Sequence, residues 1–123
     1  MRFMMLVKGN TDYEAGKPPS PALLEAIGKA SEAQAAAGIL VEAGGLLPSA
    51  AGALVRVERG KVKVIDGPFA EAKELIGGYA ILRASSKEEA IEMGRGFMQL
   101  HVDVLGPEFS GELEIRQLYE HPE

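Results

Sequence analysis

Residues 66–79 of the chain read Asp-Gly-Pro-Phe-Ala-Glu-Ala-Lys-Glu-Leu-Ile-Gly-Gly-Tyr. This stretch combines a Gly-Pro turn, four charged residues and a double glycine. Such density indicates that backbone geometry and side-chain chemistry are both specified here. The preceding run, residues 54–65, alternates apolar with charged residues and is interrupted by Arg59-Gly60. A two-residue junction with glycine is typical of a hairpin, so residues 54–58 and 61–65 are predicted to form one.

Helix signals lie on both sides of this hairpin. Ser20 followed by Pro21 starts the first helix, because a hydroxyl caps the first free amides and proline suits the first helical position. Gly38 ends that helix. Ser86 and Glu89 form a capping box that starts a second helix. Further strands are expected at residues 3–7, 39–45, 79–83 and 112–119.

The order of these elements predicts an α+β fold. Without the hairpin, the chain reads β-α-β twice, and two right-handed crossovers of this kind generate the ferredoxin-like βαββαβ core. That core is a four-stranded antiparallel sheet with both helices on one face. A chain of 123 residues suffices for one core and is too short for two. Residues 1–123 are therefore expected to form a single domain with an inserted β-hairpin.

The second face of the predicted sheet has no helix to cover it. Residues 3–7 are apolar at consecutive positions, which is typical of a strand covered on both faces. A monomer rarely leaves a contiguous apolar patch larger than roughly a few hundred Å² in water. We therefore expect a second copy to pack sheet against sheet in a symmetric homodimer.

Composition excludes several classes of function. The formal charge is -5 with scattered bases, whereas nucleic-acid binders concentrate a basic face. The N-terminal apolar run stops at Lys8, too soon for a signal peptide or a membrane span. The chain has no cysteine, and its two histidines and loose carboxylates show no metal-ligand spacing. We therefore expect a cytoplasmic protein without metal, cofactor, nucleic acid or membrane partner.

The chain resembles the YCII-related family over essentially its whole length, and in particular the DGPF-domain subset, which is named after Asp66-Gly67-Pro68-Phe69. The block 66–79 is the most specific part of this resemblance. The resemblance implies a dimeric α+β barrel. Further matching pieces are residues 2–8, Ala37-Gly38, Gly44-Gly45-Leu46, Pro48-Ser49, Glu89-Ala90, residues 97–101, residues 104–106 and Glu114-Ile115-Arg116.

The resemblance leaves the reaction open, because most members of the family have no assigned reaction. Some members pair a histidine early in the chain with an aspartate as an acid–base dyad, and one type of relative is a dehydrochlorinase acting on an aromatic ring. The histidines here are His101 and His121, so the early one is absent. DGPF proteins also often resemble, or are encoded beside, partners of extracytoplasmic-function sigma factors, which implies a transcription-linked sensing role as an alternative.

His101 and Asp66 are the candidate catalytic residues. An imidazole is the natural general base near neutral pH, and Asp103 or Asp66 could orient it. Asp66 could also take a proton if it has a partner within hydrogen-bond reach. Each also has a structural explanation. Asp66 can build the turn by bonding to amides two residues on. His101 shares a helical line with Ala90, Gly94 and Phe97, so it can simply face inward near the helix end.

Lys73, Glu74 and Tyr79 are the candidate substrate-binding residues. Lys73 could bind an anionic group while Glu74 acts on a proton, but a solvated turn with one weak salt bridge explains both equally well. Tyr79 is expected in the core, with a hydroxyl that can reach a pocket. Gly77-Gly78 lacks the lysine and serine or threonine of a phosphate loop, so we expect it to open a strand.

Two classes of function remain. One is a cofactor-free acid–base enzyme, an isomerase or lyase, that acts on a small organic substrate in a pocket near the sheet and the dimer seam. The other is a non-catalytic binding or accessory module in which the same cleft holds a small molecule. The feature that distinguishes them is whether His101 and Asp66 face one cavity.

Overall fold

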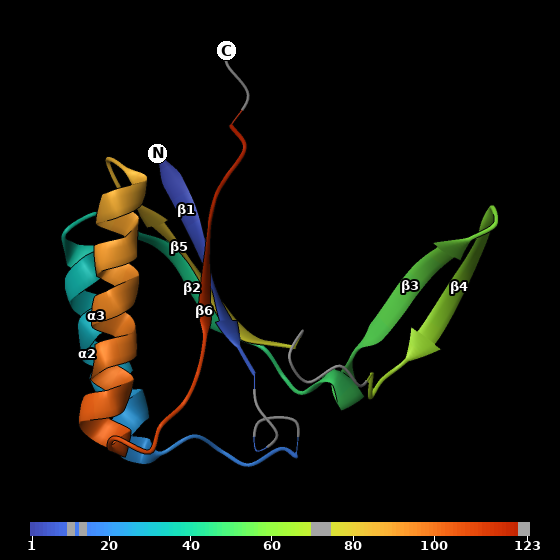
Figure 1. The fold of residues 1–123 in the computed structure, drawn as a ribbon, viewed down its shortest axis with the longest axis horizontal. Coiled ribbons are helices and arrows are strands. Elements are labelled where there is room, and N and C mark those ends of the chain that lie inside the picture. Colours follow the sequence, from blue (N-terminus) through green and yellow to red (C-terminus); the bar gives the residue numbers. More distant parts are fainter. Residues whose placement is uncertain (10–11, 13–14, 70–74, 121–123) are drawn as a thin grey trace.

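The computed structural model describes residues 1–9, 12, 15–69 and 75–120. A sheet lies between a layer of two helices and a hairpin that projects away from it (Figure 1). The elements in chain order are β1 (Arg2–Lys8), α2 (Pro21–Ala36), β2 (Leu40–Gly45), the short 3-10 helix η1 (Ser49–Ala51), β3 (Ala53–Glu58), β4 (Lys61–Asp66), β5 (Ile76–Arg83), α3 (Lys87–Leu105) and β6 (Leu113–Gln117).

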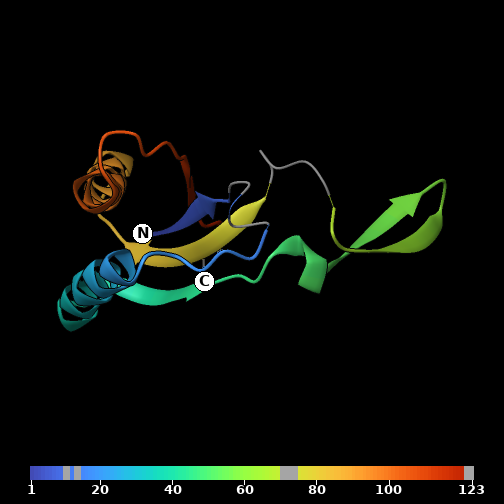
Figure 2. The same ribbon diagram turned by 90° about the horizontal axis from the view of Figure 1, so that it is seen from below.

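The main sheet has four strands in the order β2-β5-β1-β6, and its three pairings are all antiparallel. Both helices lie against one face of this sheet, as the two perpendicular views in Figures 1 and 2 show. β3 and β4 form a separate two-stranded sheet. The predicted α+β class with its inserted hairpin is confirmed, and the strand order is consistent with a ferredoxin-like core.

The predicted helix starts are confirmed by their hydrogen bonds. Ser20 Oγ accepts from the amide of Leu23 at 3.4 Å, and Pro21 is the first helical residue of α2. Ser86 Oγ accepts from the Glu89 amide at 3.1 Å at the start of α3. The Glu89 carboxylate in turn accepts from the amide of Ser85 at 3.3 Å, one residue earlier than the usual capping box. Local sequence therefore sets both helix starts.

The strand β5 begins earlier than the predicted residue 79. Its first residue is Ile76, so Gly77 and Gly78 lie inside the strand rather than before it. A side chain at Gly78 would bring its Cβ within 3.1 Å of the Gly44 carbonyl oxygen on β2. Glycine at position 78 therefore allows β2 and β5 to approach closely, in keeping with the usual meaning of glycine within a strand.

The core lies between the sheet and the helix layer. Phe3 and Met5 of β1 are buried in it, together with Leu82 of β5, Ala84 just after that strand and Ala90 of α3. Because side chains alternate across a strand, Met4 and Leu6 of β1 point to the opposite face. The continuous apolar run of β1 therefore supplies both faces of the sheet, as its sequence predicts.

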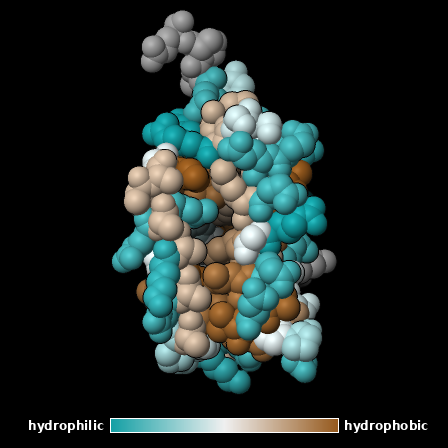
Figure 3. All heavy atoms as spheres, turned by 90° about the vertical axis from the view of Figure 1, so that its left-hand side faces the viewer, coloured by the Kyte–Doolittle hydropathy of each residue, from teal (hydrophilic) through white to brown (hydrophobic). Residues whose placement is uncertain are grey.

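The two helices of this layer contribute few buried residues to the core. Leu23 is the buried residue of α2, while α3 buries Ala90, Gly94 and His101. The surface of this layer is hollowed along its middle, and hydrophobic atoms gather in the lower part of the view, where α2 begins and α3 ends (Figure 3). Among the described residues, neither helix is long and apolar enough to cross a membrane.

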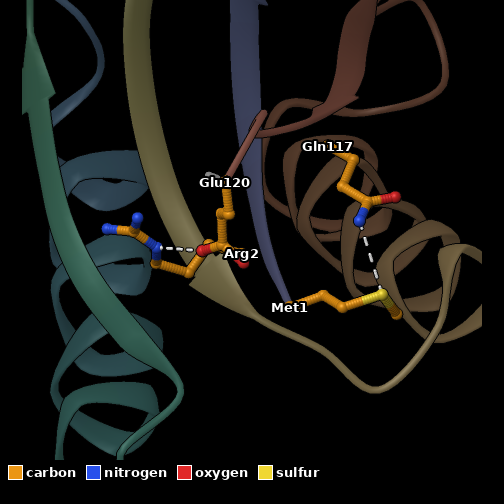
Figure 4. Close-up of polar contacts among 4 residues, drawn as sticks. All are labelled: Met1, Arg2, Gln117 and Glu120. Carbon is orange, nitrogen blue, oxygen red and sulfur yellow. Dashed lines mark hydrogen bonds and ion pairs between the residues drawn. The ribbon is translucent and has the colours of Figure 1, made fainter. Parts of the chain in front are cut away.

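The two ends of the described chain are held together because β1 and β6 are neighbours in the sheet. Arg2 Nε donates to Glu120 Oε1 at 2.6 Å, and Gln117 Nε2 donates to the sulfur of Met1 at 3.4 Å (Figure 4). The Leu118 amide continues the ladder by donating to the Arg2 carbonyl at 2.9 Å. These contacts tie the start of β1 to the end of β6 at this edge of the sheet.

Candidate functional site: the open face of the sheet and the adjoining turn

His101 is a buried residue of α3 with aromatic neighbours. Its Nδ1 lies 2.8 Å from the Phe97 carbonyl oxygen, and because a carbonyl only accepts, this nitrogen carries a hydrogen. The imidazole centroid lies 4.7 Å from the Phe97 ring and 5.2 Å from the Phe109 ring. The described contacts of His101 are thus those of a histidine packed between the end of α3 and the loop that follows.

Asp66 lies elsewhere in the molecule. It is the exposed last residue of β4 and pairs with Ala53 across the hairpin. α3 covers one face of the main sheet, whereas the hairpin extends on the other side (Figure 1). The single chain therefore does not bring His101 and Asp66 together in one cavity.

The turn after Asp66 is organised by Ser49, which no sequence motif indicates as a site residue. Ser49 is buried, accepts from the Phe69 amide at 3.2 Å and donates to the Phe69 carbonyl at 3.3 Å. The Gly67 amide donates to the Gly52 carbonyl at 2.9 Å, and the Gly67-Pro68 peptide is cis. A Cβ on Gly67 would overlap the backbone carbonyl of Ser49.

These contacts explain the Gly-Pro-Phe sequence as a structural motif. Asp66 was predicted to bond the turn amides, but in the described part of the chain Ser49 makes the side-chain bonds to this turn. Ser49 follows Pro48, which is a turn signal on its own. Nothing local in the sequence indicates that this serine meets a residue 20 positions later.

Lys73 and Glu74, two of the predicted substrate-binding residues, lie outside the described residues, as do Glu71 and His121. Tyr79 is described, and it lies in a different place from the one expected. It was predicted to be a core aromatic, but it pairs with Leu6, whose side chain points away from the helices. Tyr79 is therefore half-buried on the open face of the sheet.

The neighbours of Tyr79 fix the position of its ring. Gly44 of β2 lies directly opposite in the register, and a Cβ there would approach Tyr79 Cε1 to 3.0 Å. The ring thus lies over the glycine backbone, and its hydroxyl donates to Glu42 Oε1 at 3.4 Å. Glycine at position 44 therefore makes room for the aromatic ring, which presents a polar tip at the edge of an apolar surface.

We define the open face as the centre and rim of the uncovered sheet surface. Its centre consists of Met4, Leu6 and Ile81, which the strand register places side by side. All three are half-buried by their strand neighbours, and no helix of the described chain covers them. The rim carries Glu42 and Tyr79 at one edge, Glu114 and Arg116 at the other, and Lys8 at the end of β1.

The rim charges form a linked group on β1 and β6. Lys8 Nζ lies 3.0 Å from Glu114 Oε1, and Arg116 Nη1 lies 3.1 Å from Glu114 Oε2. The hydrogen bond from Lys8 and then that from Arg116 lower the pKa of the Glu114 carboxyl below its ordinary value. Glu114 is therefore a carboxylate at neutral pH. Within the described ranges, no cluster of three histidine or acidic side chains is placed to hold a metal ion.

Fold and site together define an α+β domain whose sheet is covered by helices on one face and open on the other. The family model of the YCII-related domain matches residues 1–98, and the chain belongs to this family. An uncharacterized protein of Rhizobium meliloti (strain 1021) is 40% identical over 50 residues. That match covers 41% of this chain and 40% of the relative, so the two share less than half of their lengths.

Ser49→Ala tests the structural role of the turn. We expect this change to lower the free energy of unfolding by about 1–3 kcal/mol, because it leaves the Phe69 amide and carbonyl without their buried partner. Urea unfolding measures the difference. Ser110→Ala, at an exposed position, is the control and should stay within about 0.5 kcal/mol. Equal effects of the two changes would contradict a structural role for Ser49.

Lys8→Met tests the linked charges on the rim. We expect the pKa of Glu114 to rise toward its ordinary value, and to rise more than in Arg116→Met, because Lys8 is the stronger influence. Side-chain NMR titration follows the carboxyl directly. The stabilising effect of the Lys8 contact should be present above about pH 4.3, the ordinary glutamate value, and be lost as the pH falls through the lowered pKa. An unchanged Glu114 titration would contradict the contact.

Proposed function

We propose that the protein is a homodimeric small-molecule-binding member of the YCII-related family, within its DGPF subset. Two copies pack open face to open face and form a dimeric α+β barrel. The observation that carries this function is the apolar centre of the open face, formed by Met4, Leu6 and Ile81 on a surface that no described helix covers. Burial of such a surface favours association by about 25 cal/mol per Å² before the cost of docking.

The rim of the open face suits a symmetric contact. Stable interfaces combine an apolar core with a polar, partly solvated rim. Here the rim carries both signs of charge, Glu42 and Glu114 as well as Lys8 and Arg116. In a twofold dimer each patch meets a copy of itself, so a rim with both signs can pair across the seam.

The binding site in this proposal lies at the seam beside Tyr79. Small-molecule sites combine an apolar lining with a few directed polar groups. The Tyr79 hydroxyl and the Glu42 carboxylate supply such groups next to Leu6. Lys73 and Glu74 are proposed to contribute an anion-binding group and a carboxylate, on the sequence pattern alone. The ligand class is therefore a small molecule with an apolar body and a hydrogen-bonding end.

A paired acid–base role for His101 and Asp66 is not part of this function. The two residues belong to elements on opposite sides of the sheet, and His101 Nδ1 is already engaged with the Phe97 carbonyl. General acid–base chemistry needs its groups within hydrogen-bond reach of one reacting centre. The accessory role beside a sigma factor rests on the family resemblance alone.

Leu6→Lys tests the dimer. A charge at the centre of the open face should weaken association by at least about 30-fold, the effect of losing a central interface residue worth about 2 kcal/mol. Light scattering coupled to size-exclusion chromatography measures the mass at several concentrations. Ala35→Lys adds the same charge at an exposed position of α2 and should leave the mass unchanged. Identical behaviour of both variants would contradict packing through the open face.

A thermal-shift screen tests the ligand site. A small molecule that binds only the folded protein raises its melting temperature, by an amount that grows with ligand concentration. For the compounds that raise it, we expect Tyr79→Phe to reduce the shift, because the change removes the hydroxyl and keeps the ring. Tyr119→Phe, at an exposed tyrosine, is the matched control. An equal shift in Tyr79→Phe would place the ligand away from this edge.

A further inference from the structure

The outer part of the β3–β4 hairpin exposes an apolar face, with Asp66 on the same face at the base of the ribbon, opposite Ala53. Val55 lies opposite Val64, and Val57 lies opposite Val62, so the four side chains share one surface of the ribbon. We call this surface the valine face. Its residues are 67–70% exposed: Val55 70%, Val57 68%, Val62 68% and Val64 67%.

The opposite face of the same ribbon is charged beyond the Leu54–Ile65 pair at its base. Arg56 pairs with Lys63 and Glu58 with Lys61 in the register. Glu58 also forms ion pairs with Arg56 at 3.8 Å and with Lys63 at 3.5 Å. The charged face is thus suited to water, whereas the valine face is not. A two-stranded ribbon of this kind is marginally stable alone and gains stability when its apolar face is packed.

The position of the hairpin limits what can cover it. The ribbon extends from the side of the sheet that faces away from the helices, in both views (Figures 1 and 2). This is the side of the open face. A second copy that sits on the open face would therefore lie next to the hairpin of the first.

Area and charge favour a second copy as the occupant. Four valines offer roughly a few hundred Å², well below the ~800 Å² per partner that a stable interface buries, so the valine face needs a neighbouring surface such as the open face. Residues 53–66 carry four of the 13 basic and two of the 18 acidic residues. The hairpin is therefore +2, while the rest of the chain is -7. A basic arm is attracted to the acidic body of another copy.

We propose that the hairpin is a dimerisation arm whose valine face packs on a second copy of this chain, extending the interface formed by the open face. This inference rests on the proposed homodimer and adds a second contact surface to it. In the twofold assembly each chain gives one arm and receives one, so both valine faces are covered at once. The charged face of each ribbon stays in water.

The test uses single cysteines, because the chain contains none of its own. Val57→Cys and Arg56→Cys place a thiol on adjacent residues of β3 that point to opposite faces of the ribbon. Both positions are exposed in the single chain. In the assembled protein we expect a maleimide to label Val57→Cys at least about tenfold more slowly than Arg56→Cys, since buried thiols react only when the site opens. Adding Leu6→Lys should abolish this difference.

The outcomes distinguish a failure of the proposed arm from a failure of the proposed dimer. Equal labelling rates in a particle of dimer mass would overturn the arm and leave the proposed dimer intact. A monomeric protein would overturn both, whatever the labelling rates. Slow labelling of Val57→Cys that persists in the dissociated Leu6→Lys background would also overturn the arm, because the valine face would then be covered by its own chain. Unfolding temperatures of the variants show whether each one is folded when labelled.

Discussion

A sheet has two faces, and this chain places both of its helices on one of them. That constraint begins in β1, where Phe3 and Met5 enter the core and Met4 and Leu6 point to the open side. Apolar surface on the open side must be removed from water or remain a cost to the folded state. All three proposals depend on covering this apolar surface: the dimer, the ligand site at its seam and the hairpin arm.

Local sequence was sufficient to predict most elements of the fold. Ser20-Pro21 starts α2 because a cap and a fixed proline dihedral act within one turn of helix. Arg59 and Gly60 both adopt positive φ, 52° and 76°, which is the geometry of the tight hairpin turn that their sequence indicates. These features depend on neighbours within a few positions, so they can be read before the fold is known.

The candidate site could be predicted only in part, because it depends on contacts between distant residues. Tyr79 lies on the open face because it pairs with Leu6 in the strand register, and Gly44 on another strand makes room for its ring. Ser49 organises the turn at Phe69, although no local pattern links the two. His101 and Asp66 are suited to acid–base chemistry as residue types, but the topology places their elements on opposite sides of the sheet.

The family assignment is consistent with the observed fold, and the exposed surfaces of this chain are the basis of the proposed assembly. The uncovered sheet face and the projecting valine face adjoin each other, and the proposed partner for both is another copy of the chain. Sedimentation equilibrium of the unmodified chain at micromolar concentration tests this most directly. The predicted result is a particle of twice the 13.1 kDa chain mass, and a single subunit of 13.1 kDa would contradict it.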